Sequence, residues 1–231
     1  GRTLERSFGL ARGLRGSGGT FAAHPSCGGM IMKAHVSASG LSHRTEGTRA
    51  IHRALPEEVP VALVFNGTTQ AVMMATPADL ADFALGFALS EGVITDPAQV
   101  QDHEIVEHSQ GIEARLWIDE DRAEALADRR RSMAGPVGCG LCGIDSLDQA
   151  MRPVPYVTSD LMLSAHDIAK ATDALREHQS LHDLTRATHA AGFLLPNAGV
   201  SLAREDVGRH NALDKLIGAL VHQGVDPKSG A

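Results

Sequence analysis

Aromatic residues and cysteines are scarce in this chain of 231 residues. Phe, Trp and Tyr make up 3 % of it, and three residues are Cys. Proteins that stack nucleic-acid bases need several aromatic side chains, so we expect no nucleic-acid partner. Three cysteines are too few, and odd in number, for a disulfide framework, which favours a reducing compartment. No run of 18 apolar residues occurs, so we expect no membrane-spanning helix.

Negative charge dominates most of the chain. The formal net charge is −7, although residues 1–53 contain eight Arg and Lys against two Glu, and the rest of the chain contains 13 against 26 acidic residues. An acidic body does not attract nucleic acid as a polyanion. A phosphate-binding site, if present, must therefore be local.

Residues 1–50 differ in composition from the remainder. They are rich in Gly, Ser and Arg and show no sustained apolar period. Three interpretations are open: a disordered or extended leader, a transit-like segment, or an upstream extension before a start at Met30 or Met32. Composition favours disorder. We therefore divide the chain into a leader, 1–50, and one folded domain, 51–231.

Helical and strand patterns alternate within residues 51–231. Apolar runs flank Asn66-Gly67 and Gln110-Gly111, which predicts two hairpins. Helical periods are typical of three further segments, and short strands are predicted on both sides of Pro196-Asn197. The three helical segments are 76–91, 164–179 and 208–223. Thr76 is the expected cap of the first, and Ser164 with Asp167 forms a capping-box arrangement at the second. On the third, Leu213 is expected to face inward and Gly224 to end the helix. The prediction is an α/β (α+β) fold: a mixed β-sheet with helices packed against it.

The stretch GPVGCGLCGIDS, residues 135–146, contains Cys139 and Cys142. One C-x-x-C pair supplies only two of the four ligands of a structural zinc site. No His is followed two residues later by Glu, as it is in zinc deaminases, so we expect no metal. A catalytic zinc with a His ligand, redox exchange and two buried structural cysteines remain open alternatives.

Sulfur transfer is the fourth interpretation of the two cysteines. A thiolate on a glycine-rich loop can attack a persulfide and hold the transferred sulfur, and a second cysteine can resolve the product as a disulfide. A helix that begins near Ile144 would favour the thiolate through its N-terminal amides. We therefore predict that Cys139 and Cys142 are catalytic.

The stretch REDVGRHNALDK, residues 204–215, places many ionisable side chains at the start of a helix. Free amides at a helix start suit a phosphate, and cationic side chains can clamp it. An exposed, capped helix start with local ion pairs is an equal alternative. The candidate cofactor-binding residues are Arg209, His210, Asn211 and Lys215, together with His189 in THAAGF.

Five stretches in this order resemble the FdhD family of formate dehydrogenase accessory sulfurtransferases. They are FNG at 65–67, MATPADLADFALGFALSEGVI at 74–94, CGLCG at 139–143, THAAG at 188–192 and EDVGRHNALDKLIG at 205–218. The resemblance covers residues 59–224. Where the family has Gly-Gly before the Thr-His stretch, this chain has Arg186-Ala187.

The resemblance implies a specific activity. A member takes sulfur from a cysteine desulfurase and holds it as a persulfide on a cysteine. That cysteine corresponds to Cys139 here, with Cys142 as its auxiliary. It passes the sulfur to the molybdenum bis-molybdopterin guanine dinucleotide cofactor of formate dehydrogenase. A cofactor-binding chaperone without sulfur transfer is the alternative. The resemblance also implies a cytidine-deaminase-like core, a homodimer in the cytoplasm, no tightly bound cofactor, and a C-terminal part of the family domain that this chain lacks.

Overall fold

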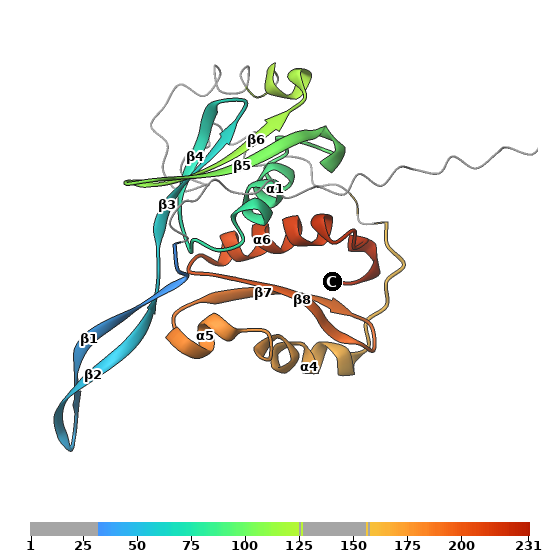
Figure 1. Cartoon of the computed structure of the whole chain (residues 1–231). Coiled ribbons are helices and arrows are strands. Elements are labelled where there is room, and N and C mark those ends of the chain that lie inside the picture. The colour runs from blue at the N-terminus through green and yellow to red at the C-terminus, as the bar shows by residue number, and fades with distance from the viewer. Residues whose placement is uncertain (1–31, 125, 127–155, 157) are drawn as a thin grey trace, which may run out of the picture.

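The structure, a computed structural model, describes residues 32–124, 126, 156 and 158–231 of the chain (Figure 1). The strands are β1 His35–Arg44, β2 Gly47–Pro56, β3 Val59–Phe65, β4 Thr68–Ala75, β5 Val100–His108, β6 Gly111–Ile118, β7 His189–Leu195 and β8 Gly199–Asp206. The helices are α1 Leu80–Ser90, α4 Ala165–Arg176, α5 Ser180–Thr185 and α6 Arg209–His222, with 3-10 turns at Pro97–Gln99 and Pro227–Ser229.

The largest sheet has four strands in the order β4-β3-β6-β5. Its central pair, β3 and β6, is parallel, whereas β4 and β5 are antiparallel to their neighbours. The two predicted hairpins form its ends: Asn66 and Gly67 both have positive φ, and Gly111 has φ 154°. Such turns match the twist of the strands that they join. The predicted mixed sheet with packed helices is confirmed.

Two helices separate this sheet from the β7–β8 hairpin (Figure 1). One face of the sheet packs on α1, and α6 lies between α1 and the β7–β8 hairpin, with α4 on the far side. The main core combines the inward residues of β3 and β6 with α1, around the fully buried Phe83. A smaller core joins Phe193 of β7 to Leu216 and Leu220 of α6.

Helices α1 and α6 are in backbone contact at two glycines. A Cβ atom on Gly86 would lie 1.7 Å from the carbonyl oxygen of Asp214, and one on Gly218 would lie 2.0 Å from that of Asp82. No side chain fits at either position without moving backbone. Glycine at both positions therefore lets α1 and α6 approach this closely.

The C-terminal helices begin and end largely where the sequence predicts. Ser164 and Asp167 form the expected capping box at the start of α4, and Gly224, with φ 63°, follows the last turn of α6. The predicted inward position of Leu213 on α6 is wrong, because this side chain is 50 % exposed.

Strands β1 and β2 form a two-stranded arm that projects from the body (Figure 1). Side chains on both faces of the arm are exposed or half-buried. This ordered hairpin crosses residue 50, where we expected the leader to end. Neither face is buried, so the apolar alternation that reveals other strands is missing here. For this reason the sequence alone predicts no strands in residues 35–50.

No helix among the described residues combines the length and the apolar composition that crossing a membrane requires. The longest, α6, has 14 residues. A span needs about 20 predominantly apolar residues.

Candidate functional site at the junction of β8 and α6

The catalytic candidates Cys139 and Cys142 lie outside the described residues. Their assigned roles therefore stay predictions. The other candidates, at the β8–α6 junction and at the start of β7, are all described. Within the described parts of the chain, no group of three His, Cys, Asp or Glu residues is placed to hold a metal ion.

The carboxylate of Asp206 organises the β8–α6 junction. It is fully buried and lies 2.7 Å from the Lys215 ammonium group, which also donates to the Thr76 carbonyl oxygen at 2.9 Å. The Thr76 and Gly208 amides and the Asn211 side-chain amide donate to its two oxygens at 3.0, 2.7 and 3.0 Å. A buried ion pair is stable only when such additional bonds complete it. The cluster joins the end of β4 to the start of α6.

Two of the predicted cofactor-binding residues belong to this interior. Lys215 has no exposed surface and Asn211 has 4 %, so both side chains have structural partners here and their contact with a cofactor stays a prediction. Asn211 donates to the carbonyl oxygen of Met74 as well as to Asp206. Burial lowers the pKa of Lys215, and the charge of Asp206 partly offsets this effect. Residue type and spacing do not distinguish a buried lysine from a ligand-binding one.

The first turn of α6 presents the other two candidates, Arg209 and His210, which are exposed. Among the described residues no side chain caps this helix, whose N-cap residue is Gly208. A Cβ atom there would lie 2.8 Å from the Asn211 side-chain nitrogen, so glycine keeps the turn tight. Cationic side chains at a helix N-terminus oppose the helix dipole, and an anion bound to the free amides would relieve this conflict.

His189 is exposed at the first position of β7, directly opposite Asp206 of β8 in the hairpin. This register places it at the same end of the hairpin as the N-terminus of α6. The carboxylate of nearby Glu205 accepts hydrogen bonds from the Leu181 and His182 amides of α5, each at 2.7 Å. Three candidates, His189, Arg209 and His210, thus remain available at the surface of this end.

Arg186 precedes this strand with φ 60°. Its left-handed conformation ends α5. Arg186 occupies one of the two positions where the family that this chain resembles has glycine. Left-handed backbone is unfavourable for most residues and free of cost for glycine. Arg186 therefore holds a turn that glycine would adopt at lower cost.

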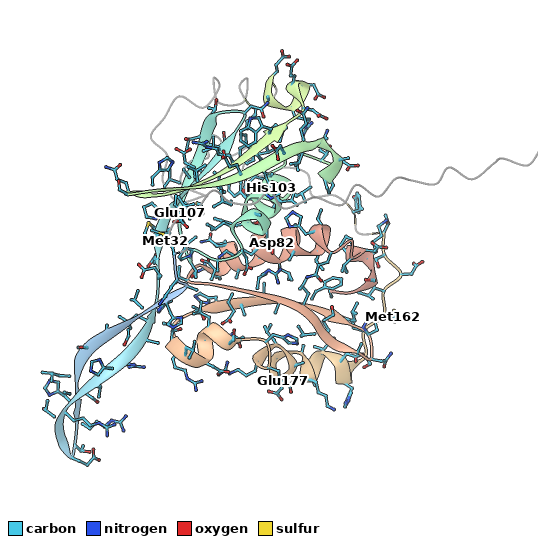
Figure 2. The ribbon with its side chains drawn as sticks, in the orientation of Figure 1. Met32, Asp82, His103, Glu107, Met162 and Glu177 are labelled. Carbon is cyan, nitrogen blue, oxygen red and sulfur yellow. The ribbon has the colours of Figure 1, made fainter. Side chains whose placement is uncertain are left out.

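A second ionic cluster, which sequence reasoning missed, ties α1, β8 and α6 together. The Arg204 guanidinium donates to Asp82 at 2.7 Å, and His222 contacts the other oxygen of the same carboxylate at 2.5 Å. Burial would raise the pKa of Asp82, but the hydrogen bonds from His222 and Arg204 outweigh burial and hold it below its usual value. Figure 2 shows Asp82 on α1 and His103 on β5, and the ring of His103 lies 6.2 Å from that of His222.

Comparison with known proteins relates the chain to one family. The model of the FdhD/NarQ family matches residues 56–231. A sulfur carrier protein FdhD from Agrobacterium fabrum is 53 % identical over 188 residues, which cover 80 % of this chain and 69 % of that protein. Proteins of the same name from Cupriavidus necator and Bordetella petrii are 55 % and 49 % identical, over 76 % and 75 % of this chain and 61 % and 63 % of theirs. The chain thus spans a little under two thirds of the length of these last two.

A solved structure shares the fold. It is described as a formate dehydrogenase accessory protein from Desulfotalea psychrophila, with a TM-score of 0.59 and 21 % identity over 86 % of this chain and 72 % of that one. At this identity the likeness concerns the fold alone.

Proposed function

Because the chain belongs to the FdhD/NarQ family, we propose that it is a sulfur carrier protein, a sulfurtransferase that acts through a cysteine persulfide. The observation that carries this proposal is the family match over residues 56–231, a range that includes both Cys139 and Cys142. Three close relatives bear the name sulfur carrier protein FdhD. The proposed donor is a cysteine desulfurase, and the proposed place of action is the cytoplasm.

The chemistry assigned to the two cysteines balances in two steps. First, the Cys139 thiolate attacks the outer sulfur of the donor's persulfide, a new S–S bond forms, and the donor's cysteine leaves as a thiolate. Second, the Cys142 thiolate attacks the inner sulfur of the Cys139 persulfide and forms the Cys139–Cys142 disulfide. The S–S bond to the outer sulfur breaks, and that sulfur leaves as sulfide with the bonding electron pair. A cellular thiol then reduces the disulfide.

The proposed acceptor is the bis-molybdopterin guanine dinucleotide cofactor of formate dehydrogenase, which is bound transiently. Its phosphates match the uncapped N-terminus of α6, where Arg209 and His210 are exposed beside free amides. Phosphates bind well at such helix ends. His189, at the same end of the β7–β8 hairpin, is the third residue that we assign to the cofactor.

The open end of α6 also favours the second candidate function. A chaperone that binds the cofactor's guanine dinucleotide or pterin without moving sulfur would need the same helix end and no reactive thiol. In this alternative, Cys139 and Cys142 are structural. The two functions therefore differ in what loss of the Cys139 sulfur does.

Complementation of a bacterial strain that lacks its own family member separates the two functions. We expect Cys139→Ala to abolish formate dehydrogenase activity, and Cys142→Ala to reduce it strongly. Cys27→Ala, outside the family match, is the matched control and should retain full activity. Full activity of Cys139→Ala would reject sulfur transfer and favour the chaperone.

A homodimer completes the proposal. The family resemblance is its origin.

A further inference from the structure

The turn between β3 and β4 consists of Asn66 and Gly67, which are both exposed. Their φ angles are positive, 45° and 76°, and Phe65 and Thr68 close the turn as opposite partners. No atom of the described residues lies within 4 Å of a Cβ atom placed on Gly67. Asparagine is a thermolabile residue, and a glycine after it leaves the next backbone nitrogen unshielded by a side chain. The turn is therefore a site where deamidation of asparagine is chemically easy.

The side chain of Asn66 is nevertheless held by a neighbouring strand. Its Nδ2 donates to the carbonyl oxygen of Ile118 at 2.9 Å, and its Oδ1 accepts from the amide of Ile118 at 2.7 Å. We call these two hydrogen bonds the Asn66 clamp. Strands β3 and β6 are parallel, with Phe65 opposite Leu116, and the backbone amide of Asn66 donates to the Leu116 carbonyl oxygen at 3.0 Å. The side-chain amide thus pairs with β6 as a further peptide group of β3 would, at the point where the chain turns into the hairpin.

Only an amide can form both bonds of the clamp. An amide side chain has a donor and an acceptor, whereas an ionised carboxylate has acceptors alone. With aspartate at position 66, the Ile118 carbonyl oxygen would lose its donor and face a negative oxygen instead. Both bonds are partly buried, so the loss is not fully compensated by water. The clamp therefore depends on the chemical group that deamidation removes.

Deamidation of Asn66 proceeds through a cyclic imide and needs only water. The backbone nitrogen of Gly67 gives up its proton to solvent and attacks Cγ of Asn66. A C–N bond forms, and Nδ2 leaves as ammonia. Water then opens the ring at one of its two carbonyl groups, which gives aspartate or isoaspartate at position 66. Since Nδ2 is the leaving group and is bonded to Ile118, ring closure requires that the clamp breaks.

We propose that Asn66 is a modification site that the fold protects. The clamp holds the side-chain amide while the ends of β3 and β6 are paired, and local opening of this end of the sheet exposes it to deamidation. The conversion is irreversible, and its product cannot form the clamp again. Each opening thus carries a chance of permanent damage to this corner of the sheet. The inference is independent of sulfur transfer, because it involves no cysteine.

Mass spectrometry of the digested full chain measures the conversion at Asn66 as the replacement of NH₂ by OH. The folded chain and the same chain in guanidinium chloride are incubated in mildly alkaline buffer. We expect conversion in the folded chain to be slower by a factor of about 10 or more, because only the locally opened fraction reacts. Asn197 and Asn211, each followed by Ala, are the internal references and should convert more slowly than Asn66 in the unfolded chain. Equal rates at Asn66 in the folded and unfolded chains would overturn the protection.

The variant Asn66→Asp reproduces the product and tests the clamp itself. Its Tm should be about 3–8 °C below that of the unaltered chain, because the Ile118 carbonyl oxygen loses its donor. Gln110→Asp places the same charge at an exposed position in the other hairpin turn of this sheet and is the matched control. Its Tm should change by less than about 2 °C. Equal Tm values for the two variants would overturn the role of the clamp, and neither result would alter sulfur loading of Cys139.

Discussion

The β8–α6 junction and the β1–β2 arm satisfy their polar groups in opposite ways. At the junction, Asp206 and Lys215 have no exposed surface and every charged atom has a partner within the protein. In the arm, three arginines on one face have no carboxylate partner among the described residues. The junction is thus a self-contained frame for the exposed helix end, whereas the charged groups of the arm are exposed to solvent.

The largest loss of stability is expected where α1 meets α6, in contrast to the exposed arm. We expect Gly218→Ala to destabilise the protein by about 4 kcal/mol or more, because a Cβ atom would lie 2.0 Å from the Asp82 carbonyl oxygen and would force the helices apart. Urea unfolding measures the change. Gly40→Ala in the arm is the control, because no atom of the described residues lies within 4 Å of the Cβ atom that it adds. Equal effects at both glycines would contradict the close helix contact.

Loss of the buried ammonium group is the next largest effect. Lys215→Met should destabilise the protein by about 3–5 kcal/mol, because the Asp206 carboxylate would stay buried without its counter-charge. Lys170→Met, on an exposed position of α4, serves as control and should change stability by less than about 0.5 kcal/mol. A tolerated Lys215→Met would show that the junction is not the ionic frame described above.

A pH-dependent effect is expected beside the junction, at Asp214. Burial raises the pKa of this carboxyl group from 3.8 to about 6, although Ser90 donates a hydrogen bond to it. Its protonation therefore stabilises the folded state below pH 3.8, and this contribution is lost as the pH rises through 6. Asp214→Asn should raise the free energy of unfolding by about 1–2 kcal/mol at pH 7.5, and by much less at pH 4.

Thermal unfolding at the two pH values measures this difference. Asp173→Asn, at an exposed position of α4, is the control. It should change stability by a small and equal amount at pH 4 and pH 7.5. A gain from Asp214→Asn that is the same at pH 4 and pH 7.5 would show that the Asp214 carboxyl group keeps an ordinary pKa.

The arm should give the smallest effect. Leu41 is 65 % exposed on the face opposite the arginines, so Leu41→Ser should change stability by less than about 0.5 kcal/mol. Dilute protein, in which the proposed dimer is dissociated, is the sample for this urea titration. A loss above 2 kcal/mol would mean that this face packs against the protein's own body.

Sequence alone predicts the elements that bury one face. The Asn66-Gly67 turn, the Ser164 cap and the Gly224 stop all have local chemistry that specifies them, and the structure confirms them. The start of α1 shows a limit: Thr76 was the expected cap, but its oxygen and amide serve the Asp206 cluster, and Asp79 is the N-cap residue.

Long-range contacts explain most of what the sequence could not show. Asp82, Arg204 and His222 are brought together only by the packing of α1, β8 and α6, and no spacing along the chain indicates that they meet. The same holds for Lys215: its charge suggested a ligand contact, and only the fold shows that it faces Asp206. The helix start itself, by contrast, was visible in REDVGRHNALDK because a glycine followed by charged residues and a helical apolar period is a local signal.

Sulfur on Cys139 is the claim that supports the proposed function, and mass spectrometry of the intact and digested protein measures it directly. After incubation with a cysteine desulfurase and cysteine, one added sulfur atom, about 32 Da, should appear on the peptide that contains Cys139. It should be absent in Cys139→Ala and still present in Cys27→Ala. Equal loading of Cys139→Ala and the unaltered chain, or no loading of either, would contradict the proposal.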